Sequence, residues 1–203
     1  MTTGSTPKGE RRRAALVEAG AQLLVEAGFD AVRHRAVAER AGLPLASTTY
    51  YFSSLDDLVT AVVEHHSRRE LERGWRKLAE LANRQRGVAT IVELMLDNLL
   101  GPRQPTPEAD AEYVLLRYER LLATGRRPYL RPLMRELGRE LRELLSEVFA
   151  RSGRPVTPDE LERYIALVDG AVVNALIEAD PDPRAVAGRM LTAALQDSDR
   201  NPA

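Results

Sequence analysis

One stretch near the start of the chain, residues 34–52, restricts the possible folds most. Val37 and Ala41 recur on one face of a helix, and Gly42 then supplies the residue type that most readily takes the left-handed conformation of a helix end. Pro44 stands where a first-turn residue needs no amide donor. The spacing predicts two short helices that meet at Gly42, which is typical of a helix-turn-helix.

The second of these helices, expected over residues 45–52, has an inward and an outward side. Thr48 and Phe52 lie four residues apart and are expected to face the core. The other side chains are expected to face outward or to line the rim: Leu45, Ala46, Ser47, Thr49, Tyr50 and Tyr51. Hydroxyl groups can donate to phosphate oxygens, and the DNA major groove admits a helix. The alternative is that both tyrosines are half-buried core residues of an ordinary helical hairpin.

About fifty positions, from Arg11 to Leu58, resemble the amino-terminal domain of the TetR family of bacterial transcriptional regulators. The matching residues are Leu16, Ala19, Leu23, Leu24, Gly28, Phe29, Val37, Ala38, Ala41, Gly42, Leu43, Tyr51, Phe52, Ser54 and Leu58. The resemblance implies that residues 45–52 form the recognition helix and that the protein works as a homodimer. It also implies a carboxy-terminal helical domain that binds a small-molecule effector and thereby alters the affinity for double-stranded DNA.

Several positions depart from the residues common in that family. A threonine is replaced by Arg33, two lysines by Leu45 and Leu55, a glycine by Ala46 and a tyrosine by Thr49. The loss of two lysines and a tyrosine removes phosphate contacts and predicts a lower nonspecific affinity for DNA.

Three residues at the start of the first helix of the motif are expected to compensate, because this end of a helix-turn-helix crosses the DNA backbone. They are Arg33, His34 and Arg35, and the alternative is a solvated charge run. Residues 1–52 carry a net charge of +2 within a chain of net charge −1, so the remainder carries −3. A basic segment on an acidic protein fits contact with DNA through one face.

The hydrophobic periodicity predicts an all-α fold of about nine helices in four regions. We expect a flexible arm at 1–8, the helix-turn-helix domain at 9–53, a linker helix at 54–83, and a ligand-binding and dimerisation domain at 84–203. The basic residues 8–13 either reach DNA phosphate or the minor groove, or form a solvated tail.

The linker helix contains two candidates for a chemical site: a pair of carboxylates at its start and two adjacent histidines further along. Ser54 and Asp57 match an N-cap and the third helical residue, and Asp56 and Asp57 point in different directions, so we predict a cap and no catalytic pair. His65 and His66 do not share a helix face, so we predict no metal site.

The last two expected helices are candidates for a dimer surface. Thr157 is an N-cap candidate before a proline, and the helix that follows, from Leu161 to Ile177, is apolar around most of its circumference. A final helix is expected from Asp182 onward. We predict a four-helix contact between subunits; the alternative is that both helices bury against other helices of their own domain.

Helical domains place ligands between helices, in mainly apolar pockets with a few polar groups. Our candidate pocket residues are Leu71, Trp75, Leu78, Met95, Asn98, Tyr113, Tyr118, Met134, Asp169 and Asn174. The alternative for each is ordinary core packing. Asp169 and Asn174 are polar within an apolar helix and are therefore expected to meet a ligand group or each other.

The remaining features narrow the class of protein. Cysteine is absent, no apolar run approaches the ~20 residues of a membrane span, and residues 1–7 lack the apolar core of a signal peptide, so we expect a cytoplasmic protein. The sequence has no glycine-rich phosphate loop, nucleophile elbow or zinc spacing. We predict a ligand-responsive repressor of a palindromic operator, without cofactor or metal. The alternative is an enzyme or small-molecule carrier built on a helical bundle.

Overall fold

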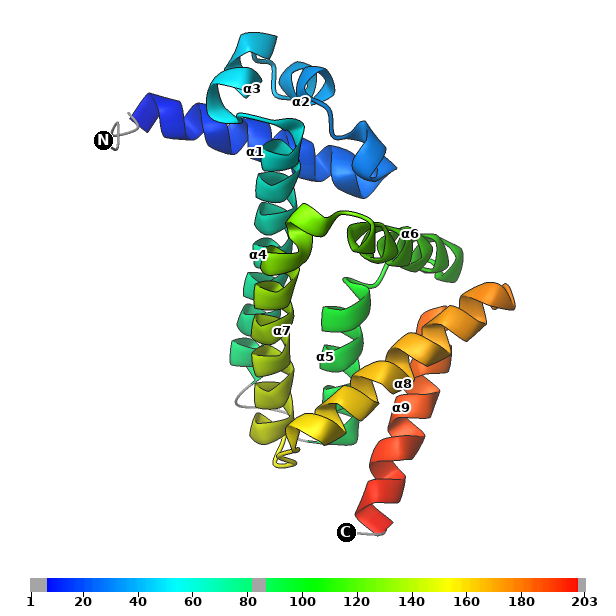
Figure 1. Ribbon diagram of the computed structural model, residues 1–203. Helices are drawn as coiled ribbons and strands as arrows, with labels where there is room; N and C mark the ends of the chain where they lie inside the picture. Colours follow the sequence, from blue (N-terminus) through cyan, green and yellow to red (C-terminus); the bar gives the residue numbers. More distant parts are fainter. Residues whose placement is uncertain (1–6, 82–86, 201–203) are drawn as a thin grey trace. The chain divides into compact units, whose positions relative to one another are not determined.

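The structure, a computed structural model, describes residues 7–81 and 87–200, and all regular structure in this part of the chain is helical (Figure 1). The elements are α1 Pro7–Ala27, η1 Phe29–Ala31, α2 His34–Arg40, α3 Leu45–Tyr51, α4 Leu55–Leu81, α5 Val88–Leu100, α6 Pro107–Gly125, η2 Pro128–Leu130, α7 Arg131–Arg151, α8 Pro158–Ile177 and α9 Pro183–Arg200. The predicted all-α fold with nine helices is confirmed for the described residues. The expected arm lies outside them up to residue 6, and residues 7 and 8 begin α1, where a proline fits the first turn.

The described residues form two compact units. Unit 1 comprises residues 7–69 and 119–135, and unit 2 comprises residues 70–81, 87–118 and 136–200. Helices α4, α6 and α7 each contribute residues to both units. Residues 119–135 therefore group with the helix-turn-helix, an association that the sequence did not suggest.

The core of unit 1 joins the helix-turn-helix to α1 and to the first half of α4. Leu16, Val37, Phe52 and Leu58 belong to one buried hydrophobic cluster, which also takes in Leu130 of η2. Figure 1 shows α2 and α3 lying along the same side of α1. This packing stabilises α2 and α3, because helices of seven residues are not stable alone.

The turn between α2 and α3 is a Schellman motif. The amide of Leu43 donates to the carbonyl of Ala38 at 2.9 Å, and the amide of Gly42 donates to the carbonyl of Glu39 at 3.1 Å. Gly42 has φ of 64°, a conformation that side chains with a Cβ rarely adopt. The predicted break at Gly42 is therefore confirmed by its hydrogen bonds.

Two helix starts have the predicted caps. Ser54 Oγ accepts a hydrogen bond from the amide of Asp57 at 3.0 Å at the start of α4. At the start of α8, Thr157 Oγ accepts from the amide of Glu160 at 3.3 Å, and the amide of Thr157 donates to the Glu160 carboxylate at 2.7 Å. The second is a complete capping box.

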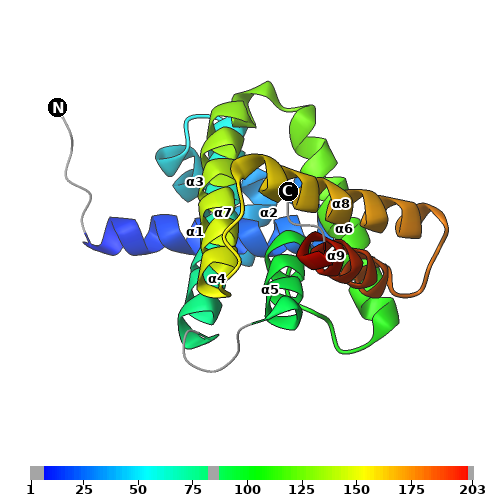
Figure 2. The ribbon, with the colours of Figure 1, turned by 90° about the horizontal axis from the view of Figure 1, so that it is seen from below.

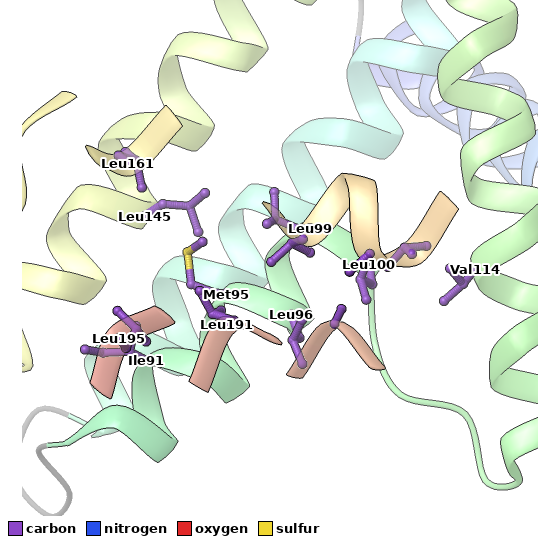
Figure 3. Close-up of a cluster of buried hydrophobic side chains, with 14 of the residues drawn as sticks. Ile91, Met95, Leu96, Leu99, Leu100, Val114, Leu145, Leu161, Leu191 and Leu195 are labelled. Atoms are coloured by element: carbon purple, nitrogen blue, oxygen red, sulfur yellow. The ribbon is translucent and has the colours of Figure 1, made fainter. Parts of the chain in front are cut away.

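The core of unit 2 is centred on α5, with α9 packed against both α5 and α8 (Figure 2). Figure 3 shows Ile91 and Met95 of α5 beside Leu191 and Leu195 of α9, and all four are buried. The cluster extends to Phe149 and to the inner face of α8. Nearly every apolar side chain of α5 is thus used in packing.

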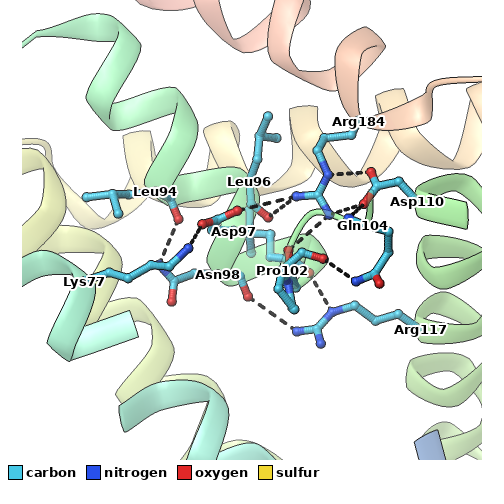
Figure 4. Close-up of polar contacts among 12 residues, drawn as sticks. Lys77, Leu94, Leu96, Asp97, Asn98, Pro102, Gln104, Asp110, Arg117 and Arg184 are labelled. Atoms are coloured by element: carbon cyan, nitrogen blue, oxygen red, sulfur yellow. Dashed lines mark hydrogen bonds and ion pairs between the residues drawn. The ribbon is translucent and has the colours of Figure 1, made fainter. Parts of the chain in front are cut away.

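Two buried arginines satisfy the carbonyl groups at the end of α5 (Figure 4). Arg117 Nε donates to the carbonyl of Leu99 at 2.9 Å, and Arg184 Nη2 donates to the carbonyl of Gly101 at 3.1 Å. These carbonyls have no partner within a helix, and a cation there also complements the helix dipole. Each arginine is paired in turn with a carboxylate, Glu70 for Arg117 and Asp110 for Arg184.

Candidate nucleic-acid interface

Helix α3 is held to unit 1 by residues on one side only. Thr48 is fully buried and its hydroxyl donates to the carbonyl of Leu45 at 2.8 Å, and Phe52 is buried at the helix end. The guanidinium of Arg13 lies over the Phe52 ring, 5.3 Å from its centroid. The predicted inward orientation of Thr48 and Phe52 is therefore found.

The opposite side of α3 is exposed. Tyr50 is 81% exposed and Leu45 is 46% exposed. Ala46 and Thr49 are exposed, whereas Ser47 and Tyr51 are half-buried. The Tyr50 and Tyr51 rings meet edge to face with centroids 4.9 Å apart, so the inner ring supports the outer one.

The alternative reading of the tyrosines as core residues applies only to Tyr51. Tyr51 packs partly against the hydrophobic cluster of unit 1, whereas Tyr50 is exposed. Nothing in the fold of the described residues requires an exposed tyrosine at position 50. Its hydroxyl is free to meet a polar partner from outside the chain.

The three residues around the start of α2 take different positions. Arg33 is the N-cap residue, is exposed and pairs with Asp30 at 3.3 Å, and Arg35 is exposed with Glu39 at 3.7 Å. Such exposed ion pairs contribute little to stability, so both guanidinium groups can exchange partners. His34 is half-buried, and within the described structure its buried Nδ1 has no hydrogen-bond partner.

The basic residues at the start of the chain were expected to form either an arm or a tail. Pro7 to Arg13 are instead the first turns of α1, where Arg11 Nε donates to the carbonyl of Pro7 at 3.1 Å. Lys8, Arg11 and Arg12 are exposed there. The contact between Arg13 and Phe52 at the end of α3 was missed in the sequence, because their separation along the chain gives no periodic signal.

Residues predicted for a ligand pocket fall in both units. Trp75 is 40% exposed, Met95 is buried in the core of unit 2, and Asn98 donates to the carbonyl of Leu94 at 2.8 Å. Met134 belongs to the cluster of unit 1, and Asn174 is exposed on α8. Leu71 and Leu78 are buried, and Tyr113 lies close enough to Gly101 that a Cβ there would be 2.8 Å from its ring.

One pair from this set is brought together. Tyr118 Oη donates to the Asp169 carboxylate at 2.7 Å. Burial raises the pKa of the Tyr118 hydroxyl, and the negative charge of Asp169 raises it further. The hydroxyl therefore stays protonated and remains a donor. Asp169 was expected to meet a ligand group or Asn174, but its hydrogen-bond partner is Tyr118.

Helices α8 and α9 are buried on one side and exposed on the other. Val168 and Val172 of α8 are buried in the cluster of unit 2 with Leu191 of α9. Ile177 of α8 is 77% exposed and Met190 of α9 is 44% exposed. Packing within their own domain, the alternative reading, accounts for the buried sides of both helices. It gives no role to their exposed apolar sides.

His65 has a structural partner in unit 1. Its Nε2 lies 2.9 Å from the Glu18 carboxylate, to which Arg69 donates at 2.6 Å. The hydrogen bond with His65 is the largest of the influences that hold the pKa of Glu18 below its ordinary value.

Within residues 7–81 and 87–200, no group of three His, Cys, Asp or Glu residues could hold a metal ion. No helix of these ranges is long and apolar enough to cross a bilayer.

Comparison with known proteins gives two family matches. Residues 16–62 match the model for bacterial regulatory proteins of the tetR family, and residues 84–197 match the model for a tetracyclin repressor-like C-terminal domain. No protein with a curated function matches the chain.

Solved structures resemble the chain over most of its length. The multidrug binding protein EbrR in complex with ethidium is 30% identical, covers 90% of the chain and 97% of its own, and has a TM-score of 0.63. EbrR complexed with malachite green is 28% identical, with coverages of 90% and 96% and a TM-score of 0.61. A TetR-family member from Streptomyces coelicolor A3, SCO1917, is 27% identical, with coverages of 90% and 96% and a TM-score of 0.61. The chain belongs to the TetR family and is a DNA-binding transcriptional regulator.

Proposed function

We propose that this regulator is a ligand-responsive repressor that binds a palindromic operator as a homodimer. The observation that carries the proposal is the exposed side of α3, on which Tyr50 is 81% exposed while Thr48 beneath it is fully buried. A short helix fixed on one side and free on the other can enter the major groove. Two such helices in a dimer would read half-sites about one turn of DNA apart, ~34–36 Å.

The proposed DNA-binding residues divide into two groups. The outward side of α3 would meet base edges and nearby phosphates: Leu45, Ala46, Ser47, Thr49, Tyr50 and Tyr51. Arg33, His34 and Arg35 would contact the phosphate backbone from the start of α2. The two exposed guanidinium groups bind phosphate readily, and the half-buried His34 would donate from its ring. Leu45, in place of a lysine, offers apolar contact with a thymine methyl group and no charge.

Dimerisation would use the exposed sides of α8 and α9. Val173, Ile177 and Met190 are large apolar residues with 40%, 77% and 44% of their surface exposed. Gly170 lies on the same helix, and no heavy atom comes within 4 Å of where its Cβ would be, so a second helix could approach closely. Large apolar side chains exposed on two helices that pack against each other favour a protein contact. Two copies would form a four-helix contact.

The effector would be a small organic molecule bound among the helices of unit 2. EbrR has been solved with ethidium, proflavin and malachite green, which makes such dyes suitable first probes for this chain. Our candidate contacts in unit 2 are Trp75, Met95, Asn98, Tyr113, Tyr118, Asp169 and Asn174. Bound effector weakens operator binding only if it prefers the conformation with the wrong spacing of the two α3 helices.

DNA binding is tested by fluorescence anisotropy with labelled fragments that flank the protein's own gene. Tyr50→Ala and Arg35→Ala should each weaken binding while changing the free energy of unfolding by less than about 1 kcal/mol, as expected for exposed positions. Arg35→Ala should also reduce the salt dependence of binding by about one phosphate contact. Arg151→Ala, which removes an exposed arginine at the end of α7, is the charge-matched control. Unchanged affinity of both test variants would reject α3 and α2 as the interface.

The response to ligand is tested on the same complex. Ethidium and malachite green are first titrated into the protein to find a dye that binds, and the DNA affinity is then measured with and without it. A weaker affinity supports the repressor mechanism, whereas unchanged affinity with bound dye contradicts it.

The dimer is tested by analytical ultracentrifugation of Ile177→Glu. The substituted side chain is exposed, so the fold should persist while the dimer dissociates. Leu121→Glu, which changes another exposed leucine on α6, should leave the dimer intact. A persistent Ile177→Glu dimer would show that α8 is not its interface.

A further inference from the structure

Unit 1 contains an open hollow of about 680 Å³ that is separate from the candidate pocket residues of unit 2. Three parts of unit 1 line it: the segment before α2, the first two turns of α4, and the end of α6 with the turn that follows it. The lining residues are Phe29, Asp30, Arg33, Leu55, Asp56, Val59, Glu119, Leu122, Ala123, Arg126, Arg127 and Tyr129. Its volume is that of sites for drug-sized ligands, about 300–1,000 Å³.

The apolar part of the hollow is fixed by packing. Phe29 and Val59 are buried in the core of unit 1. The guanidinium of Arg127 lies 4.0 Å from the centroid of the Phe29 ring and donates to the carbonyl of Ala123 at 2.8 Å. In contrast, Leu122 is 74% exposed although it lines a concave surface. The hollow therefore offers a formed apolar wall with a large leucine that nothing in unit 1 covers.

The polar part of the hollow carries both signs of charge in equal number, three carboxylates and three guanidinium groups. Only Asp30 and Arg33 form an ion pair with each other, at 3.3 Å and largely in solvent. Asp56 and Glu119 have no ion-pair partner within the described residues, and Arg126 is exposed. Tyr129 and Asp56 line the same hollow; burial raises the pKa of the Tyr129 hydroxyl, and the negative charge of Asp56 raises it further.

We propose that this hollow is a second small-molecule site, for a flat amphoteric organic molecule with one cationic and one anionic group. Its apolar body would lie against Leu55 and Leu122, beside the Arg127 guanidinium that covers the Phe29 ring. Its cationic group would meet Asp56 or Glu119, and its anionic group Arg126 or Arg33. A ligand of one sign would bring its charge close to a like charge and leave the opposite groups desolvated without a partner.

Arg33 gives the site a connection to DNA binding. It lines the hollow and is the N-cap residue of α2, and it is one of the residues that we propose to contact phosphate. An anionic ligand group on Arg33 would compete with a DNA phosphate. This consequence rests on the proposed function, whereas binding in the hollow does not.

The charge preference is tested with three dyes that share a xanthene ring system, by fluorescence anisotropy with the full chain. Rhodamine B is a zwitterion near neutral pH, rhodamine 6G is its cationic ester relative, and fluorescein is an anion. Rhodamine B should bind at least about tenfold more tightly than either of the others, equivalent to ~1.4 kcal/mol. Equal binding of the three dyes, or no binding of rhodamine B, would overturn the proposal.

The location is tested with matched pairs of variants. Leu122→Trp fills the hollow and should weaken rhodamine B binding about tenfold. Leu121→Trp, on the exposed neighbour that does not line the hollow, should leave it unchanged. If both variants bind rhodamine B as the wild type does, the dye lies elsewhere, and the proposal fails without affecting the proposed regulator.

A charge swap adds an independent readout. Arg126→Glu should weaken rhodamine B binding and strengthen rhodamine 6G binding, because it gives the lining a surplus of negative charge. Arg131→Glu makes the same change at an exposed arginine of α7 outside the lining. An equal response to both substitutions would indicate a general effect of net charge and would contradict a local site. Circular dichroism confirms that each variant is folded.

Discussion

The buried pair of Asp110 and Arg184 gives the sharpest stability prediction. Their side chains are 2% and 3% exposed, and Arg184 Nε and Nη2 donate to the two Asp110 carboxylate oxygens at 2.6 and 3.2 Å. Asp110→Asn keeps the shape and one acceptor oxygen but removes the negative charge. The Arg184 cation is then buried without its main counterion.

The expected cost follows from what remains around Arg184. Removing one partner of a buried ion pair typically costs about 3–5 kcal/mol. The Asp97 carboxylate is still 3.8 Å from Arg184 Nη1, and the carbonyls of Leu96 and Gly101 still accept from the guanidinium. These contacts place the expected loss near the lower end, about 3 kcal/mol. For a chain of this length, that lowers Tm by about 6–12 °C.

The assay is urea and thermal unfolding followed by circular dichroism at matched protein concentration, since a dimer makes Tm depend on concentration. The control is Glu108→Gln in the same first turn of α6, where the carboxylate is exposed. Both substitutions remove a similar interaction with the helix dipole, worth about 0.3–1 kcal/mol. The difference between them isolates the buried pair.

A second substitution separates two effects of Asp110→Asn: the loss of hydrogen bonds, and the burial of an unpaired Arg184 cation. Arg184→Met in the Asp110→Asn background removes the unpaired cation and should recover part of the lost stability. Only part is expected back, because the carbonyl of Gly101 then loses its donor. If Asp110→Asn costs no more than Glu108→Gln, or if the double variant is less stable than Asp110→Asn, the reasoning is refuted.

Three further predictions concern backbone and acid stability. Gly74→Ala should cost about 1–3 kcal/mol, because its Cβ would lie 2.1 Å from Asn98 Oδ1 and 2.6 Å from Leu144 Cδ2. Gly170→Ala, where no heavy atom lies within 4 Å of the added Cβ, should instead stabilise the monomer. Equal Tm values for the two variants would contradict this. Thr157→Ala removes the capping box and should cost about 1 kcal/mol in urea unfolding, with Thr157→Ser retaining most of it. The pKa of Glu18 lies below its ordinary value in the folded chain, so its contribution to stability is present above the unfolded pKa and is lost as the pH falls through the folded pKa. Glu18→Gln should therefore flatten the acid side of a plot of Tm against pH, and an unchanged slope would count against the pairing with His65 and Arg69.

The helix-turn-helix could be predicted because its determinants are local. Gly42 ends α2 through hydrogen bonds that span five residues, and Ser54 and Thr157 cap helices through the amide three residues ahead. The same holds for the inward side of α3, since Thr48 and Phe52 are one helical turn apart. The residues that interact in each case lie three to five positions apart, so a short segment of sequence contains both partners.

The candidate sites depended on contacts between distant segments, and these were harder to predict. Tyr118 and Asp169 were both proposed for a pocket, but nothing in the spacing indicated that they would bind each other. The hollow of unit 1 was not predicted, because its walls come from segments around residues 30, 57 and 123, which lie far apart in the sequence. Periodicity assigns residues to a face of a helix and does not say which faces meet.

The buried arginines show that a local rule can nevertheless indicate a long-range contact. Arg184 is the second residue of α9, where the positive end of the helix dipole disfavours a cation. A cation in that position needs a compensating partner, and here the Asp110 carboxylate and the end of α5 supply it. Arg33 at the start of α2 is in the same unfavourable position, and its only ion pair within the described residues is the exposed one with Asp30. Arg33 is solvated and so does not require such a partner, but a DNA phosphate or an anionic ligand group in the hollow would offset its repulsion by this helix end.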